Sequence, residues 1–519
     1  MKKNNIKYFG FASAVFVVII FIFNFNHLNQ QGTYENIFSQ IAINLIHGKD
    51  YTCSALGNLP LLYPLWGYTG IVLIDTLFDF NNALVMLFQY SLCLIVIKIF
   101  YKIYQINPKY RHLFYFLPFI AMMSVKWPDA IVGALLFLYG YFVIKSIVAD
   151  LNNGQFIMDN EQLRNGENKK EFTIHNSQFT IKKSEVGSQK SIGRKLGIRN
   201  EELGIKKPGD RSQETDDGSQ TSFDKLRMTE VNGKWKYMIL SGIVLGLILN
   251  FRTEYLFMPL VFLVFISFPQ MKGRRKVLFQ TTIVSWTIAV IFLLPWAFRA
   301  KNISGDLQFT ASNSGAVMFL SLGQLPNNKW GIAPYDKTVY DIADSLGYPS
   351  PYSYQANTYF NQKSSELIIK HPVEFAKKMG YNFFSIWKGG IYTGEYANYF
   401  ISENRRNEID NLINSAKGVF NKINVILNLR VNESISLFFE KALQGIFIPV
   451  LFLLMALFIL SYYKQKGEYF NIVFLVGAAI ILYKIAIVCL VQYEYRHINS
   501  IYLFLLGTGM KTFIGKEKG

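Results

Sequence analysis

The chain has 519 residues and a formal net charge of +18, and 51% of its residues are hydrophobic. Several apolar runs approach or reach the roughly 17–25 residues that a helix needs to cross a bilayer. The composition therefore argues against a soluble protein and predicts a polytopic membrane protein. Lys and Arg collect in short loops, as the positive-inside rule requires, and some of them can meet anionic lipid. Membrane topology thus explains most of the excess positive charge without a nucleic-acid partner. The sequence also contains no basic–aromatic module that reads nucleic acids.

The N-terminus, MKKNNIK, is followed by an apolar run from Tyr8 to about Asn26, with no small-x-small cleavage site after it. We expect an uncleaved anchor whose N-terminus is cytoplasmic. The cysteines are scattered (Cys53, Cys93 and Cys489). They predict neither a disulfide framework nor a metal cluster.

The first outer loop, residues 28–81, is the most informative stretch. Apolar residues recur in it at helical spacing and predict an amphipathic helix: Ile37, Phe38, Ile41, Ala42 and Leu45. Glu35 stands at the start of this helix. After Pro60 a more apolar piece follows, which we expect to lie along the bilayer surface with Tyr63, Trp66 and Tyr68 at headgroup level. We interpret the loop as the floor of a chemical site at the outer face of a membrane.

The apolar runs predict ten spans, in chain order 8–27, 82–104, 112–125, 130–149, 236–251, 255–269, 277–298, 445–463, 469–492 and 498–511. Ten spans put both termini inside, and every short basic loop then falls on the cytoplasmic side. The predicted fold is mainly α. It is a polytopic membrane helical bundle with amphipathic helices in the first outer loop and a partly folded extracytoplasmic domain.

Two segments interrupt the spans. Residues 150–234 hold 15 Lys and Arg against 14 Asp and Glu, with no sustained apolar periodicity. We interpret them as a disordered cytoplasmic insertion, because there is too little apolar material for a small folded domain. Residues 299–444 are of mixed polarity, with helical stretches around 364–384 and 404–428, and predict the extracytoplasmic domain.

The chain is thus divided into five parts, which are the N-terminal membrane part with its outer loop (1–149), the insertion (150–234), membrane spans (235–298), the extracytoplasmic domain (299–444) and C-terminal membrane spans (445–519).

Charged residues near the outer ends of the predicted spans are expected to meet on one face: Glu35, Lys126, Asp129, Arg252, Glu254, Arg299, Glu494 and Arg496. Ionisable groups at membrane depth are costly and are usually functional or paired. Transfer of a sugar from a lipid phosphate needs a carboxylate to take the proton of the incoming hydroxyl. It also needs cations to stabilise the departing phosphate.

Catalytic roles are predicted for Glu35 and Asp129. Structural alternatives exist for both carboxylates, because Glu35 can favour the first turn of its helix through the helix dipole and Asp129 can cap the span that follows it.

Phosphate binding is predicted for four cations: Lys126, Arg252, Arg299 and Arg496. Glu254 and Glu494 are expected to support them. The alternatives are ion pairs between Arg252 and Glu254 and between Glu494 and Arg496, and an interfacial anchor role for Arg299. No metal site is predicted, since the histidines lack ligand-spaced partners. No P-loop or glycine-rich βαβ fingerprint is present, which argues against a sugar-nucleotide donor.

Several stretches resemble one family, the GT-C membrane glycosyltransferases, which include protein O-mannosyltransferases and aminoarabinose transferases. The first outer loop of that family usually carries an Asp-Glu pair, a Tyr four residues after the Asp, then Ala-x-Asn-Leu and a Gly. Here Ala42-x-Asn44-Leu45 and Gly48 match, Phe38 replaces the Tyr, and the pair reads Tyr34-Glu35. Either Glu35 substitutes for the family's catalytic Asp, or catalysis is altered or lost.

Later stretches resemble the family in the same order. They are Pro128-Asp129, GIVLGLILNFR ending at Arg252, Leu294-Pro295-Trp296-x-x-Arg299 and Glu494-x-Arg496. The resemblance implies transfer of a sugar from a polyprenyl-phosphate carrier, with inversion, on the extracytoplasmic side of a bacterial inner membrane. The acceptor is a lipid, a polysaccharide or a protein, and some relatives use a divalent cation. Two other classes remain open, an O-antigen-type polymerase or ligase and a non-enzymatic transporter.

Overall fold

The computed structural model describes residues 33–53, 66–78, 83–106, 128–164, 217–389, 401, 403–464, 468–492 and 500–514. The chain divides into two units, one formed by residues 1–147 and 236–519 and the other by residues 148–235. The described residues form helices and turns without a β-strand. The mainly α prediction is therefore confirmed.

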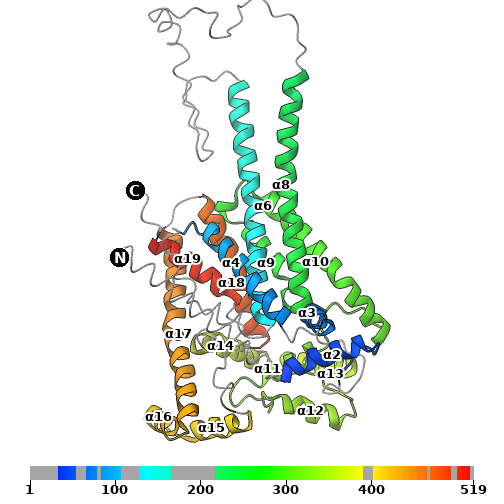
Figure 1. Ribbon diagram of the computed structural model, residues 1–519, viewed down its shortest axis with the longest axis vertical. Helices are drawn as coiled ribbons and strands as arrows, with labels where there is room; N and C mark the ends of the chain where they lie inside the picture. The colour runs from blue at the N-terminus through cyan, green and yellow to red at the C-terminus, as the bar shows by residue number, and fades with distance from the viewer. Residues whose placement is uncertain are drawn as a thin grey trace, which may run out of the picture. The chain divides into compact units, whose positions relative to one another are not determined.

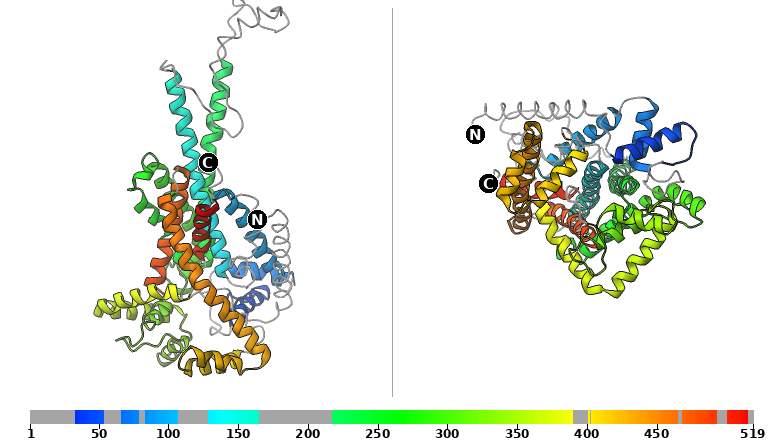
Figure 2. Two further views of the ribbon diagram at one scale, coloured as in Figure 1. Left: turned by 90° about the vertical axis from the view of Figure 1, so that its left-hand side faces the viewer. Right: turned by 90° about the horizontal axis from the view of Figure 1, so that it is seen from below.

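The described part of the chain up to Ser304 contains α2 (Thr33–Ile46), α3 (Trp66–Leu77), α4 (Ala83–Ile103), α6 (Pro128–Arg164), α8 (Asp217–Phe251), η4 (Thr253–Tyr255), α9 (Met258–Phe265), η5 (Pro269–Met271) and α10 (Arg275–Ser304) (Figure 1). The next segment contains α11 (Ser314–Leu322), α12 (Asp336–Ser345), α13 (Tyr354–Lys370), α14 (Pro372–Gly389), α15 (Glu403–Ser415) and α16 (Val419–Leu427). The C-terminal part contains α17 (Val431–Lys464), α18 (Glu468–Leu490) and α19 (Tyr502–Ile514), with α17 packed against α19 (Figures 1 and 2).

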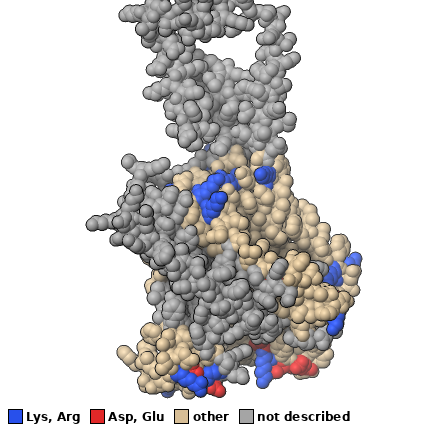
Figure 3. All heavy atoms as spheres, viewed as in Figure 1, with Lys and Arg blue, Asp and Glu red and all other residues tan. Residues whose placement is uncertain are grey.

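Four helices among the described residues are long and apolar enough to cross a membrane: Ile131–Ala149 in α6, Gly233–Phe251 in α8, Arg275–Ser304 in α10 and Tyr469–Leu490 in α18. Shorter apolar helices include Ile448–Tyr463 in α17. Two of the predicted spans, 8–27 and 112–125, lie outside the described residues. The ten-span topology stays a prediction. On the face drawn in Figure 3, much of the described surface is uncharged between basic side chains near the top and mixed charges near the bottom.

Both helices that border the predicted insertion continue into it. α6 runs on to Arg164, and α8 begins at Asp217. Extending an existing helix costs far less than nucleating a new one, so an apolar span can propagate into polar sequence. The rest of the segment, 165–216, lies outside the described residues, so its predicted disorder stays a prediction.

The glycine-rich part of α8 permits close packing on α10. A Cβ added at Gly242 would lie 2.7 Å from Ile288, and one added at Gly246 would lie 2.6 Å from Phe292. Small residues let membrane helices approach closely. The glycines that precede Arg252 therefore have a structural role.

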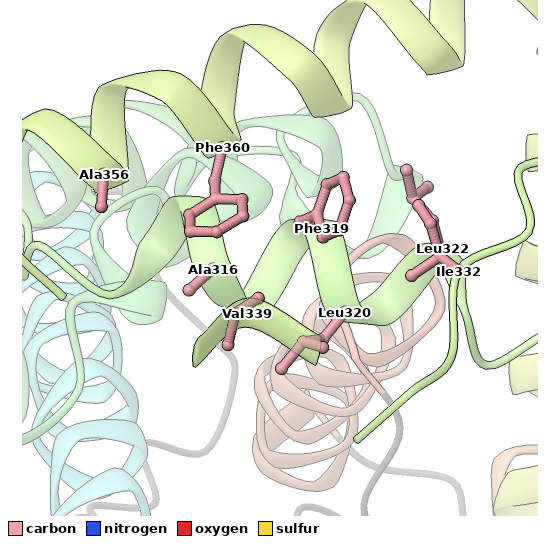
Figure 4. Close-up of a cluster of buried hydrophobic side chains, with 8 residues drawn as sticks. All are labelled: Ala316, Phe319, Leu320, Leu322, Ile332, Val339, Ala356 and Phe360. Carbon is pink, nitrogen blue, oxygen red and sulfur yellow. The ribbon is translucent and has the colours of Figure 1, made fainter. Parts of the chain in front are cut away.

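Helices α11, α12 and α13 fold around a core of their own, in which α11 and α13 pack together (Figure 4). The core residues are Ala316, Phe319, Leu320, Leu322, Ile332, Val339, Ala356 and Phe360. The two helical stretches predicted for residues 299–444 are each divided. α14 begins at Pro372, which cannot donate a backbone hydrogen bond to the preceding helix. Gly418, with φ +86, separates α15 from α16.

Candidate functional site

Side-chain positions are described for only three of the eight predicted site residues. Lys126, Glu494 and Arg496 lie outside the described residues. Glu35 and Asp129 lie in the first turns of α2 and α6, but their side chains are outside the described part. The geometry of the site therefore comes from the other three residues, Arg252, Glu254 and Arg299, and from the groups around them.

The first outer loop forms the expected amphipathic helix. In α2 the side chains of Ile37, Phe38, Ile41 and Ala42 are buried and Leu45 is half-buried, which confirms the predicted apolar face.

Two residues of the family-like motif, Asn44 and Gly48, have structural roles at the end of α2 and in the turn after it. Asn44 donates to the carbonyl oxygen of Thr52 at 2.9 Å and to its hydroxyl at 3.2 Å. Gly48 has φ +69, a conformation that favours glycine. Asn44 and Gly48 thus turn the chain back towards α3 after α2 ends.

Tyr51 fixes this turn against α3. Its side chain is 2% exposed, and its hydroxyl lies 2.8 Å from the hydroxyl of Thr69. Burial raises the pKa of the Tyr51 hydroxyl above its ordinary value. The hydroxyl is therefore protonated at neutral pH and acts in a hydrogen bond, not as a base.

Arg299 is held on the turn that follows α2. Its Nη2 lies 3.4 Å from Oδ1 of Asp50. Its guanidinium carbon is 5.0 Å from the centre of the Tyr51 ring and 5.6 Å from that of the Trp296 ring. The i, i+3 spacing of Trp296 and Arg299 puts both side chains on one face of α10. Arg299 thus contacts the first outer loop, which is more than the interfacial anchor role requires.

A second charged centre lies where α8 ends. Arg252 has an extended backbone (φ −147, ψ 101), and the short helix η4 follows it. Glu254 in η4 accepts a hydrogen bond from the Lys484 ammonium at 2.5 Å. Lys484 also lies 5.1 Å from the centre of the Tyr255 ring. The break between α8 and α9 therefore brings a carboxylate to a lysine of α18.

Lys484 is a residue that the sequence analysis missed. Its side chain is 3% exposed, and it lies within the apolar stretch Tyr469–Leu490, six residues before the end. A lysine inside an apolar span was itself a signal, since such residues are usually paired or functional. Arg252 is close enough to Lys484 for repulsion between the two positive charges. The Glu254–Lys484 pair thus lies within the electrostatic influence of a second cation, Arg252.

The first residues of α3 connect the two centres. A Cβ added at Gly67 would lie 2.7 Å from the carbonyl oxygen of Asn250, two residues before Arg252. Thr69, two residues after Gly67, bonds to Tyr51 beside Arg299. Hence the first outer loop contacts both the end of α8 and the C-terminal part of α10. The position of the Glu35 and Asp129 carboxylates relative to this region stays a prediction.

Among the residues that the structure describes, no three His, Cys, Asp or Glu side chains come together as metal ligands. A divalent cation remains an expectation from the resemblance alone.

Comparison with models of known protein families, with curated proteins and with solved structures finds no match to this chain. The resemblance to GT-C enzymes therefore rests on the sequence motifs.

Proposed function

We propose that the protein is a GT-C-type glycosyltransferase of the bacterial inner membrane, with its active site on the extracytoplasmic side. It moves a sugar from a polyprenyl-phosphate-linked donor to a lipid, polysaccharide or protein acceptor. The observation that carries the proposal is the contact of the first outer loop with both the end of α8 and Arg299. A donor held in the bilayer presents its phosphate at the membrane surface, where arginines at helix ends can bind it.

The proposed reaction is a displacement at the anomeric carbon. The acceptor hydroxyl forms the new bond to that carbon while the bond to the phosphate oxygen breaks. Glu35 takes the hydroxyl proton, with Asp129 as the second carboxylate. The phosphate oxygen leaves with the bonding electrons, and Arg252 and Arg299 stabilise the charge that grows on it. Lys126 and Arg496 are assigned to the same phosphate, and Glu254 and Glu494 support the cations.

A transporter is the second candidate. Transporters bind their ligands at interrupted helices, and α8 and α9 are separated by η4, where Glu254 pairs with Lys484. Uptake of a solute or lipid into sealed vesicles without any glycan product would favour this candidate. An O-antigen-type polymerase or ligase would instead show normal transfer by both Glu35→Gln and Asp129→Asn variants.

The test uses the purified full chain, a panel of labelled polyprenyl-phosphate sugars and an acceptor extract. The expected result is release of polyprenyl phosphate that depends on the acceptor. Arg252→Gln and Arg299→Gln should each lower turnover by about 10²–10³-fold, the usual loss when a group that stabilises transition-state charge is removed. Lys363→Gln, on the exposed face of α13, is the matched control and should keep full turnover. A panel from which no donor is consumed would end the proposal.

A further inference from the structure

Helix α14 has its polar side buried and its apolar side exposed. The buried stripe has the spacing of one helix face and consists of Glu374, Lys378, Asn382 and Ser385. On the opposite side, Val373 is 69% exposed and Phe384 is 65% exposed, with the Lys377 side chain, 61% exposed, as the one charged group between them. A surface helix in water has the reverse arrangement. The exposed side of α14 is therefore suited to an apolar environment, and the attachments of the helix decide whether it meets one.

The buried stripe attaches α14 to the end of an apolar span. The Lys378 ammonium donates to the carbonyl oxygens of Cys489 at 3.2 Å, Leu490 at 2.9 Å and Val491 at 2.6 Å. Asn382 donates to the carbonyl oxygen of Val488 at 3.2 Å. The last carbonyls of a helix have no partner within the helix, so α14 supplies donors to the last turn of α18. In Figure 1 and in the left view of Figure 2, α14 lies crosswise at this end of α18.

The C-terminal part of α14 reaches a second apolar helix. The Trp387 ring stacks on the Phe452 ring of α17, with 5.1 Å between ring centres and 26° between ring planes. Phe452 is 51% exposed and Leu453 is 54% exposed, within the apolar stretch Ile448–Tyr463. Such an exposed apolar side of a membrane helix faces lipid. The exposed side of α14 is continuous with it.

We propose that α14 is an interfacial helix whose outward side, formed by Val373, Phe383, Phe384 and Trp387, inserts into the outer headgroup region of the lipid bilayer. Its attachment to the end of α18 and to Phe452, near the start of the apolar stretch of α17, sets this depth. Aromatic side chains are favoured there because one environment accommodates both apolar rings and polar groups. The proposal does not depend on the reaction proposed above.

Helix α16 provides the contrast. Phe420 is 88% exposed on it and Leu427 is 65% exposed. Among the described residues, however, α16 shows no bond to the end of an apolar span comparable to those of Lys378. It lies before α17, whose apolar stretch begins at Ile448, 21 residues after Leu427. We therefore expect the exposed side of α16 to lie in water.

The test compares two spin-labelled variants of the full chain, Phe384→Cys and Phe420→Cys, in vesicles of phosphatidylcholine and phosphatidylglycerol. The native cysteines Cys53, Cys93 and Cys489 are buried, and the unsubstituted chain serves as the labelling blank. For each label we compare the ratio of its collision rate with oxygen to its collision rate with a water-soluble nickel chelate. This ratio should be several-fold higher at position 384 than at position 420. Val373→Cys, at the other end of α14, should behave like Phe384→Cys.

Two results would overturn the proposal. One is equal access of the nickel chelate to positions 384, 373 and 420, which would place α14 in water. The other is protection of position 384 from both reagents, with spin–spin broadening that disappears on dilution with unlabelled chain. That result would show that a second copy of the chain covers α14.

Discussion

The two ion pairs around the candidate site have similar chemistry but different surroundings. Lys484 and Glu254, 230 positions apart, meet at 2.5 Å with side chains only 3% and 24% exposed. Arg299 and Asp50, 249 positions apart, meet at 3.4 Å with side chains 15% and 58% exposed. Each pair joins distant parts of the chain, but only the first is largely removed from water.

Burial changes what a pair contributes. Removing one partner of a buried pair leaves a charge without hydration, which is strongly destabilising. An exposed carboxylate is still hydrated, so the pair that it forms contributes little to stability. The Glu254–Lys484 pair therefore holds the break between α8 and α9. Asp50, by contrast, can give way to another anion at Arg299 at small cost, as a phosphate-binding role requires.

The largest expected effect is on the buried pair. Lys484→Met should lower the free energy of unfolding by about 3–5 kcal/mol, because Glu254 then stays partly buried without its cation. The double variant Lys484→Met with Glu254→Gln should recover part of this loss. Denaturant unfolding in detergent micelles would measure both. If Lys484→Met were as stable as the parent chain, the Glu254–Lys484 pair would contribute no more to stability than the exposed pair.

A smaller loss is expected at α14. Lys378→Met should lower the free energy of unfolding by about 1–3 kcal/mol, because three carbonyl groups lose their donor. Amide hydrogen exchange in the last turn of α18 should also become faster. Lys370→Met is the matched control, since Lys370 is exposed at the end of α13, and it should change neither quantity. Equal effects of the two variants would contradict the assigned role of Lys378.

The same lysine predicts a pH dependence. Burial lowers the pKa of Lys378 to about 7, although the carbonyl oxygens around it favour the charged form. The unfolded chain holds this proton up to a pH of about 10.4. Between these values the unfolded state binds more protons, so stability rises with pH, by at most about 1.4 kcal/mol per unit.

Below pH 7 both states are protonated, and the cost of burying the charge is fully present. Unfolding of the parent chain and of Lys378→Met, compared from pH 6.5 to 9, should show the rise only in the parent. An identical slope in both would assign the dependence to other groups.

The smallest effect is expected at the exposed pair. Asp50→Asn should change the free energy of unfolding by at most about 1 kcal/mol, and added salt should reduce the difference further. Thermal unfolding at low and high salt would measure it. A loss comparable to that of Lys484→Met would show that Asp50 and Arg299 also form a structural pair.

Part of the site followed from local patterns. The apolar face of α2 was predicted by its helical spacing, and α8 ends directly before Arg252, where the apolar run ends. The partner of Glu254 was not predictable in this way. Lys484 lies 230 positions further along the chain, and nothing local distinguishes it from a lysine that faces a water-filled cavity. For the same reason, no local pattern indicated that Lys378 bonds to the end of α18.

The amino-acid sequence alone determined that the chain is helical and rich in apolar helices, because side-chain periodicity and run length act over neighbouring residues. Only the tertiary structure decided which charges meet, since Asp50, Lys378 and Lys484 find their partners more than 100 positions away. It also decided that α14 buries its polar side, because the open carbonyls of another helix provide acceptors that no local pattern can reveal.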